Sequence, residues 1–149
     1  MGESQIDRAL HLARDAHRGQ VDKLGVDYLK HVEAVAEAVR HLGEVYQITA
    51  LLHDSIEDCD DRDVVSLKDI ADLFGVAVAD AVDCMTKRPD ESYDDGYLPR
   101  VLRNEIARQV KLADVRHNRS RLHLLSDPAT RDRLQTKYDK TLAVLTAQS

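Results

Sequence analysis

The chain has 149 residues, which is enough for one domain with a buried core. Its 27 acidic and 21 basic residues give a net charge of −6, which argues against nucleic-acid binding as the main task because that task needs a basic face. Aromatic residues are scarce, with no Trp and one Phe, and this composition favours an α-helical bundle over a β-sandwich or barrel.

The two cysteines, Cys59 and Cys84, are too few for a disulfide framework. The sequence shows no signal peptide and no apolar run long enough to cross a bilayer. We therefore expect a soluble protein of the reducing cytoplasm, with one domain over residues 1–149 and no membrane partner. The sequence does not indicate the oligomeric state.

Helix signals divide the first third of the chain into three segments. Ser4, followed by an acid three residues later, resembles a capping box and opens a helix expected over residues 4–18. A polar loop at residues 19–25 is bracketed by two glycines. A second apolar stripe stops at Gly43, and a third helix then runs into an adjacent His-Asp pair.

The rest of the chain predicts four further helices and a polar loop at residues 87–96. Ser66 with Asp69 forms a capping box, and Asp127-Pro128 is an N-cap followed by proline at the first helical position. The helices are expected from Ser66 to Gly75, from there to about Thr86, from Pro99 towards Asp114, and from Asp127 onward. We identify no repeat and no strand, so the fold class is all-α.

The His-Asp pair at residues 53–54 follows an apolar helix, and charge in such a place must be paired, hydrogen-bonded or bound to a cation. Imidazole and carboxylate ligands without thiolate suit Mn²⁺, Fe²⁺, Co²⁺ or Zn²⁺. Four protein ligands on a six-coordinate ion leave room for water and a substrate oxygen. The candidate ligands, drawn from three helices, are His31, His53, Asp54 and Asp114.

Two further groups of residues extend this candidate site. Glu57 and Asp58, one turn beyond the His-Asp pair, are placed to orient a water or to shuttle its proton. Lys111, Asp114 and Asn118 share one helix face, and a carboxylate between a cation and an amide fits a metal with a phosphate beside it. The acidic run at residues 60–63 is interpreted as a solvated loop, because an EF-hand needs a Gly and a closing Glu that are absent.

The order of these motifs resembles the HD-domain metal-dependent phosphohydrolases and, within them, the alarmone hydrolases of the RelA/SpoT-homologue family. The resemblance covers nearly the whole chain. It is carried by Ala16-His17-x-Gly19-Gln20-x-x-Lys23-x-Gly25-x-x-Tyr28-Leu29-x-His31, Ala50-Leu51-Leu52-His53-Asp54-x-x-Glu57-Asp58, Phe74-Gly75, Thr86-Lys87 and Val110-Lys111-Leu112-Ala113-Asp114-x-x-x-Asn118.

The resemblance implies a single-domain, HD-type helical bundle with one Mn²⁺ held by the four candidate ligands. It implies that Glu57 and Asp58 activate the attacking water. It also implies a small stand-alone hydrolase that removes the 3′-pyrophosphate from guanosine tetra- or pentaphosphate. For the nucleotide it implies that Lys23, Tyr28 and Tyr138 line the pocket, and that Asn118 lies near the ribose and the 3′-phosphates.

One position departs from the family pattern. The family usually has Arg-Lys where this chain has Asp22-Lys23, and that arginine packs against the base. An anion in place of a planar cation removes a stacking partner and adds repulsion towards phosphates. The base preference is therefore open between guanine and adenine.

Two other functions are compatible with the same residues. Another HD phosphohydrolase, such as a nucleoside 5′-monophosphatase, would use the same four ligands. A non-catalytic nucleotide-binding or partner-binding module would keep the fold without turnover, although the presence of both Glu57 and Asp58 speaks against it. The released product separates these alternatives, since the alarmone hydrolase releases pyrophosphate.

Overall fold

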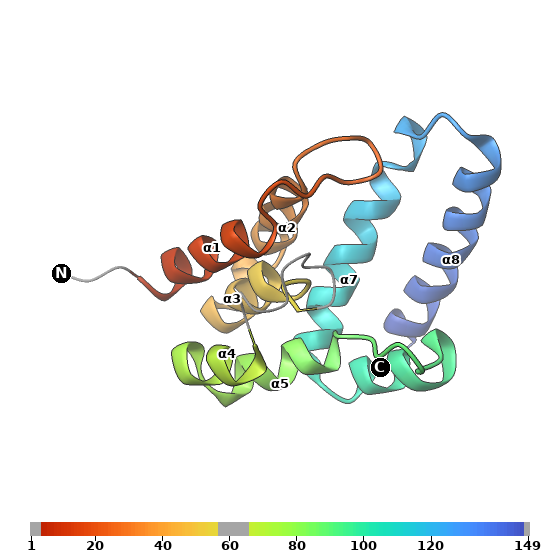
Figure 1. The fold of residues 1–149 in the computed structure, drawn as a ribbon. Helices are drawn as coiled ribbons and strands as arrows, with labels where there is room; N and C mark the ends of the chain where they lie inside the picture. The colour runs from red at the N-terminus through yellow and green to blue at the C-terminus, as the bar shows by residue number, and fades with distance from the viewer. Residues whose placement is uncertain (1–3, 57–65, 148–149) are drawn as a thin grey trace.

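The computed structural model describes residues 4–56 and 66–147, and over these residues the protein is all-α, as the sequence predicts (Figure 1). Within these ranges no strand forms, although Val21 and Asp27 pair in an isolated antiparallel bridge. No described helix is long and apolar enough to span a membrane. The helices are α1 (Gln5–Ala16), α2 (Tyr28–Ala38), α3 (Glu44–Leu52), α4 (Leu67–Phe74), α5 (Val76–Cys84), α6 (Leu98–Leu102), α7 (Glu105–Ser120) and α8 (Pro128–Thr146).

Side-chain caps fix the starts of several helices. The Ser4 hydroxyl accepts the backbone N–H of Asp7 at 3.1 Å at the start of α1. Before α4, Ser66 and Asp69 form a full capping box, each side chain accepting the other's backbone N–H. Asp127 caps α8, with Pro128 at its first position. These predicted helix starts are confirmed.

The long helix predicted from Pro99 towards Asp114 is wrong in one respect, because the structure divides it into α6 and α7. The chain becomes extended at Asn104, whose side chain accepts the N–H of Ala107 at 2.9 Å and so begins a new helix. The apolar stripe continues across the break, so periodicity alone does not reveal it. The predicted polar loop also ends earlier, since residues 93–97 form a turn of π-type helix that leads into α6.

The core lies where α1, α2, α5 and α7 surround α3. Small side chains on α1, such as Ala9 and Ala13, are fully buried and let this helix approach α3 closely. Leu52 on α3, Val82 on α5 and Val110 on α7 complete the packing. Because α3 is surrounded, the residues that follow its last turn are held in the interior of the protein.

The segment between α1 and α2 forms a compact loop that reaches towards the end of α7 (Figure 1). Gly19 and Gly25 have φ values of +76° and +79°, a conformation that other residues rarely adopt. The backbone N–H of Asp22 donates to the carbonyl of Val26 at 2.8 Å, and that of Tyr28 donates to Gln20 at 3.0 Å. The loop thereby places residues 21–24 beside α7 and α8, which run antiparallel to each other.

Candidate metal and nucleotide site

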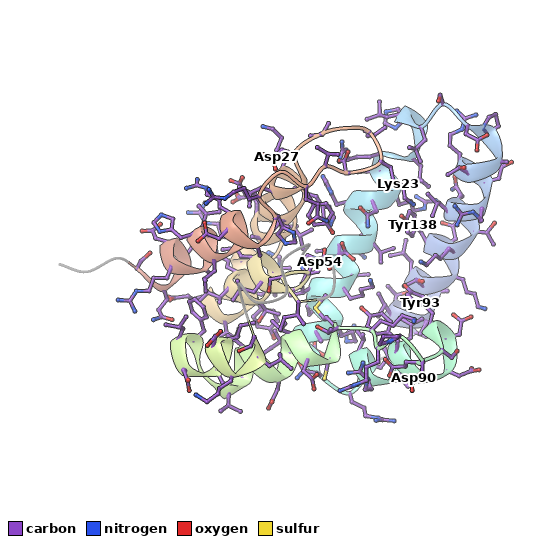
Figure 2. The ribbon with its side chains drawn as sticks, viewed as in Figure 1. Lys23, Asp27, Asp54, Asp90, Tyr93 and Tyr138 are labelled. Atoms are coloured by element: carbon purple, nitrogen blue, oxygen red, sulfur yellow. The ribbon has the colours of Figure 1, made fainter. Side chains whose placement is uncertain are left out.

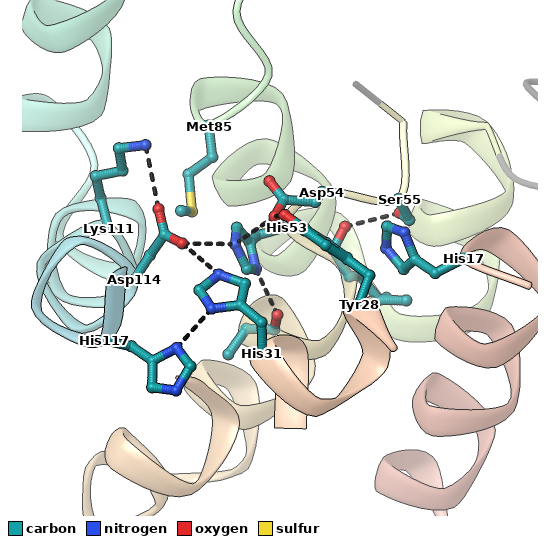
Figure 3. A network of polar contacts seen from close by, with 12 residues as sticks. His17, Tyr28, His31, His53, Asp54, Ser55, Met85, Lys111, Asp114 and His117 are labelled. Atoms are coloured by element: carbon teal, nitrogen blue, oxygen red, sulfur yellow. Dashed lines mark hydrogen bonds and ion pairs between the residues drawn. The ribbon is translucent and has the colours of Figure 1, made fainter. Parts of the chain in front are cut away.

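The four predicted ligands come together at one point, although they lie on three separate helical elements (Figure 3). His31 lies in the first half of α2, His53 and Asp54 directly follow α3, and Asp114 lies within α7. One potential ligand atom from each residue lies within 4.8 Å of all the others. His31, His53 and Asp114 are 5% exposed or less, so the cluster is shielded from bulk water.

His53 presents one ring nitrogen to this cluster and is held from behind by the other. Its Nδ1 donates to the carbonyl oxygen of Ala50 at 2.6 Å, which leaves Nε2 facing the cluster. Nε2 lies 3.0 Å from Asp54 Oδ2 and 3.5 Å from Asp114 Oδ1, and it is buried without a hydrogen-bond partner among the described residues. A buried nitrogen that faces two carboxylates in this way fits a cation between them.

His31 is arranged like His53: one ring nitrogen faces the cluster, and the other is hydrogen-bonded, here to a side chain instead of a backbone carbonyl. Its Nε2 lies 2.7 Å from Asp114 Oδ1, and its Nδ1 shares a hydrogen bond of 2.7 Å with Nδ1 of His117 (Figure 3). With Nδ1–H donating to His117, the Nε2 lone pair of His31 is available at the centre of the cluster. His117 is therefore a residue of the site that the sequence analysis missed.

The two carboxylates are also oriented by neighbours. The hydroxyl of Tyr28 donates a short hydrogen bond to Oδ2 of Asp54. The Nζ of Lys111 lies 3.2 Å from Oδ2 of Asp114, so the other oxygen of Asp114 faces the two histidines. Tyr28 and Lys111 thus each contact a candidate ligand directly, and their predicted part in substrate binding stays a prediction.

The charge balance of the cluster suits a divalent cation. Burial opposes a proton on His53, but the carboxylates of Asp54 and Asp114 outweigh burial and hold the pKa of this imidazole well above its usual range. Burial likewise opposes the charge of Asp114, yet Lys111 and the two histidines keep the pKa of its carboxyl well below its usual range. A cation bound here would take the place of the proton on His53 and would meet two imidazoles and two carboxylates.

The cluster opens into a cavity of about 220 Å³ whose wall includes several lysine side chains. Asp54 and Asp114 form one part of its wall, and three lysines, Lys87, Lys111 and Lys137, form another. Burial lowers the pKa of Lys137, and the neighbouring Lys111 and Lys23 lower it further. Such a wall suits a ligand with several negative charges beside the metal site.

A second cavity, of about 300 Å³, adjoins the first. Tyr28, Asn118 and Tyr138 contribute to the walls of both cavities. Figure 2 shows Tyr138 between Lys23, which lines the second cavity, and Tyr93, which lines the first. The remaining wall is largely apolar, with Val21, Leu24, Leu122, Leu125 and Leu134. An apolar cavity joined to a cationic one matches the two ends of a nucleotide.

Asp22 lies in the wall of this second cavity, but its charge is compensated. Its Oδ2 accepts a hydrogen bond of 2.8 Å from Nη1 of Arg121, the residue that follows α7. The repulsion towards phosphates expected from the sequence is therefore offset by a cation that the sequence analysis did not place next to Asp22. Glu57 and Asp58, the predicted catalytic residues, lie outside the described residues.

The structure adds contacts between residues that lie far apart in the sequence. His117 reaches His31 across 86 positions and Arg121 reaches Asp22 across 99, so neither pairing has a signal in sequence spacing. Lys87 and Lys137 enter the cationic wall from a loop and from α8. A weak signal existed for Lys137, since it directly precedes the predicted pocket residue Tyr138.

Comparison with known proteins places the chain in a family. A family model described as the HD domain matches residues 9–94, more than half of the chain. The chain belongs to the HD-domain family. This match includes His31, His53 and Asp54, whereas Asp114 lies beyond it on α7.

Curated relatives of this HD-domain protein include two proteins named guanosine-3′,5′-bis(diphosphate) 3′-pyrophosphohydrolase. The Vibrio cholerae protein is 43% identical over 79 residues, covering 51% of this chain. The Danio rerio protein is 31% identical over 126 residues, and the match covers 73% of this chain and 64% of the Danio rerio protein. The first curated relatives are much longer than this chain, which spans 17% of a GTP pyrophosphokinase of Streptomyces coelicolor and 10% of the Vibrio cholerae protein.

A solved structure has the same HD-domain fold. It is that of a metazoan orthologue of SpoT, described as hydrolysing ppGpp, and it aligns with a TM-score of 0.80. The alignment covers 100% of this chain and 89% of the other at 23% identity. At this identity the likeness concerns the fold, and it confirms the all-helical bundle.

Proposed function

We propose that this protein is a divalent-metal-dependent hydrolase that removes the 3′-pyrophosphate from (p)ppGpp-type alarmones. One observation carries the proposal: the cluster of His31, His53, Asp54 and Asp114 opens into a lysine-lined cavity, which adjoins an apolar one. The names of the Vibrio cholerae and Danio rerio relatives support the same reaction. Mn²⁺ is the proposed ion: nitrogen and oxygen ligands without thiolate suit it as they suit Fe²⁺, Co²⁺ and Zn²⁺, and the resemblance to the RelA/SpoT-homologue hydrolases implies Mn²⁺ among these.

The described residues have different roles in the proposed reaction. When bound, a divalent ion makes water a nucleophile at neutral pH and withdraws charge from a phosphoryl oxygen. Lys87, Lys111 and Lys137 neutralise the negative charge of the 3′-pyrophosphate group, which passes from the ribose 3′-oxygen to the attacking water and would otherwise be repelled by the two carboxylates. Tyr28 holds Asp54 in place through its hydroxyl.

The remaining proposed roles rest on the sequence and on the positions of cavity residues. Asn118 lies in the walls of both cavities, which supports a position near the ribose and 3′-phosphates. Tyr138 and Lys23 line the apolar cavity and are proposed to contact the base and its attached groups. Glu57 and Asp58 are proposed to activate the attacking water, a role taken from the sequence alone.

Product analysis tests the proposal. Mn²⁺-loaded protein is incubated with guanosine and adenosine alarmones and with GMP, and pyrophosphate is separated from orthophosphate. We expect pyrophosphate from an alarmone, no product after EDTA treatment and recovery on adding Mn²⁺. Orthophosphate from GMP alone would indicate a nucleoside monophosphatase instead. Intact Mn²⁺ binding without turnover would indicate a binding module.

A single substitution separates water activation from metal binding. Glu57→Gln keeps the size of the side chain and removes its charge, so we expect Mn²⁺ binding to be retained while the rate falls strongly. A variant that retained the wild-type rate would remove Glu57 from the proposed machinery. Titration of Mn²⁺ by calorimetry provides the independent readout of the metal site.

A further inference from the structure

The carboxylate of Asp22 is the anchor of the loop between α1 and α2. Its Oδ1 accepts the backbone N–H groups of Leu24 at 2.8 Å and Val26 at 3.0 Å, and its Oδ2 accepts from Nη1 of Arg121 at 2.8 Å. The Asp22 side chain is only 15% exposed. Since a carboxylate has about four acceptor sites, three of which are used here, Asp22 has little capacity left for a ligand.

Arg121 differs from Asp22, because among the described residues most of the N–H donors of Arg121 have no acceptor. A guanidinium carries five N–H donors in a rigid plane, and Asp22 uses one of them. Arg121 lies three residues beyond Asn118 and lines the same cavity as Asn118 and Tyr138. The ion pair fixes one edge of the plane, so the remaining donors are oriented before a ligand arrives.

The other cavity groups do not compete with Arg121 as fixed, planar donors. The ammonium of Lys23 is on an exposed, flexible side chain, and the hydroxyl of Tyr28 is bound to Asp54. Five lining side chains are aliphatic and suit the faces of a purine ring. Arg121 is therefore a charged, planar group in this wall with donors for the edge of a base, beside the amide of Asn118 and Tyr138, which is proposed to contact the base.

The two purines present different edges to such a donor pair. Guanine offers two neighbouring acceptors, O6 and N7, which match a guanidinium in two parallel hydrogen bonds. Adenine places an amino donor beside N7, so a guanidinium there would set donor against donor and leave one of them unpaired. A wall with Arg121 in this position consequently discriminates between the two bases.

We propose that Arg121, held in position by Asp22, makes this pocket select guanine over adenine. The inference rests on the proposed nucleotide site and deepens it by naming the residue that reads the base. Arg121 contacts the ligand, whereas Asp22 is a positioning residue that acts through Arg121. The departure from the family pattern at position 22 is thus consistent with a guanosine ligand.

Equilibrium binding of GDP and ADP to the Mn²⁺-loaded protein tests this inference. Neither nucleotide has a 3′-pyrophosphate, so the measurement reads the base whether or not the protein is an alarmone hydrolase. We expect the wild-type protein to bind GDP at least about tenfold more tightly than ADP, the lower end of what one bidentate contact supplies. Equal affinities, or tighter binding of ADP, would overturn the proposal.

Substitutions at position 121 give the sharpest readout. Arg121→Ala should bring the ratio of the two affinities close to one, mainly by weakening GDP binding. Arg121→Gln should go further and favour ADP, because an amide offers one donor and one acceptor and so matches adenine. A purely structural role for Arg121 predicts no such reversal. An unchanged ratio in both variants would contradict the proposal.

Three further variants test the assignment and control for indirect effects of a substitution. Arg119→Ala is the matched control, because Arg119 pairs with Asp139 at 2.6 Å and does not line the cavity; its ratio should equal that of the wild type. Arg121→Lys keeps the charge and should still lower the ratio. Asp22→Asn should lower the ratio partway, and no change there would contradict the positioning role of Asp22.

Discussion

Two clusters of polar groups in this protein differ in how their donors and acceptors are matched. In the first, His31, His53, Asp54 and Asp114 direct atoms towards one point, and a buried nitrogen of His53 has no hydrogen-bond partner. In the second, Arg100 joins the loop before α6 to α5, and its donors are paired at distances between 2.7 and 2.9 Å.

In the second cluster, neighbouring acceptors bind the donors of Arg100, and we call this the closed cluster. The Nε and Nη2 of Arg100 donate to the two carboxylate oxygens of Glu91 at 2.7 Å each. The backbone carbonyls of Asp83 and Thr86 accept from Nη1 and Nη2 at 2.8 and 2.9 Å. A cluster with matched donors and acceptors holds the chain together, whereas one with unmatched lone pairs at a single point is suited to bind a cation. The two should therefore respond to different perturbations.

The largest effect is expected from Asp54→Asn. The amide removes one negative charge from the ligand set, so we expect Mn²⁺ affinity to fall by more than about a hundredfold, beyond the cost of losing an outer-shell partner. Pyrophosphate release should disappear with the ion, while the helical circular dichroism stays unchanged. Calorimetric Mn²⁺ titration measures the loss, and Asp72→Asn, an exposed acid paired with Lys68, is the control. Wild-type affinity in the Asp54 variant would contradict the account.

The second effect concerns the residue behind His31. His117→Phe keeps a flat ring but removes the nitrogen that shares a hydrogen bond with Nδ1 of His31, so this imidazole loses the contact that orients it. We expect Mn²⁺ affinity to fall by about 10- to 100-fold, the usual range for such partners. His123→Phe, at an exposed position on the turn after α7, should leave affinity unchanged. Equal affinities for the two variants would show that His117 has no part in metal binding.

Disruption of the closed cluster should lower stability and spare the metal site. Arg100→Ala removes four hydrogen bonds that join residues 83–91 to α6, so we expect Tm to fall by about 5 °C. Mn²⁺ affinity should stay within about twofold of wild type, since the two clusters share no residue. Arg88→Ala, which breaks an exposed pair with Asp83, should change Tm by no more than about 1 °C. A loss of metal affinity in the Arg100 variant would remove the distinction between the clusters.

The smallest effect is a pH dependence of the same cluster. Hydrogen bonds from Arg100 lower the pKa of Glu91 from 4.5 to about 2. A depressed carboxyl pKa contributes stability above the unfolded value, and this contribution is lost as pH falls through the folded value. The difference in Tm between wild type and Glu91→Gln should therefore be largest near neutral pH and shrink between pH 4.5 and about 2. A difference that stays constant over this range would show that the pair is not charged in the folded protein.

Local signals explain how much of this molecule can be predicted from its sequence. Ser66 and Asp127 are caps whose partners lie three residues away, so the starts of α4 and α8 follow from the sequence. The break at Asn104 is also local, but the apolar stripe crosses it and hides the second cap. The four candidate ligands were predictable for two reasons. Charge in a His-Asp pair at the end of an apolar helix must be paired, hydrogen-bonded or bound to a cation, and the order of the motifs along the chain resembles that of the RelA/SpoT-homologue hydrolases.

The residues that support the ligands were not predictable in the same way. His117 acts through His31, and Asp22 acts through Arg121. Each pair meets only because α7 packs beside α2 and the loop before it. Lys87 and Lys137 face one cavity from elements that the sequence places 50 positions apart. Such pairings depend on tertiary packing, which periodicity and capping do not specify.

Anomalous diffraction from Mn²⁺-soaked crystals tests the central claim most directly, because it locates the ion without reference to activity. The account predicts one strong peak per chain, within coordination distance of His31, His53, Asp54 and Asp114. A peak elsewhere, or His31 or Asp114 turned away from the other two ligands, would contradict it.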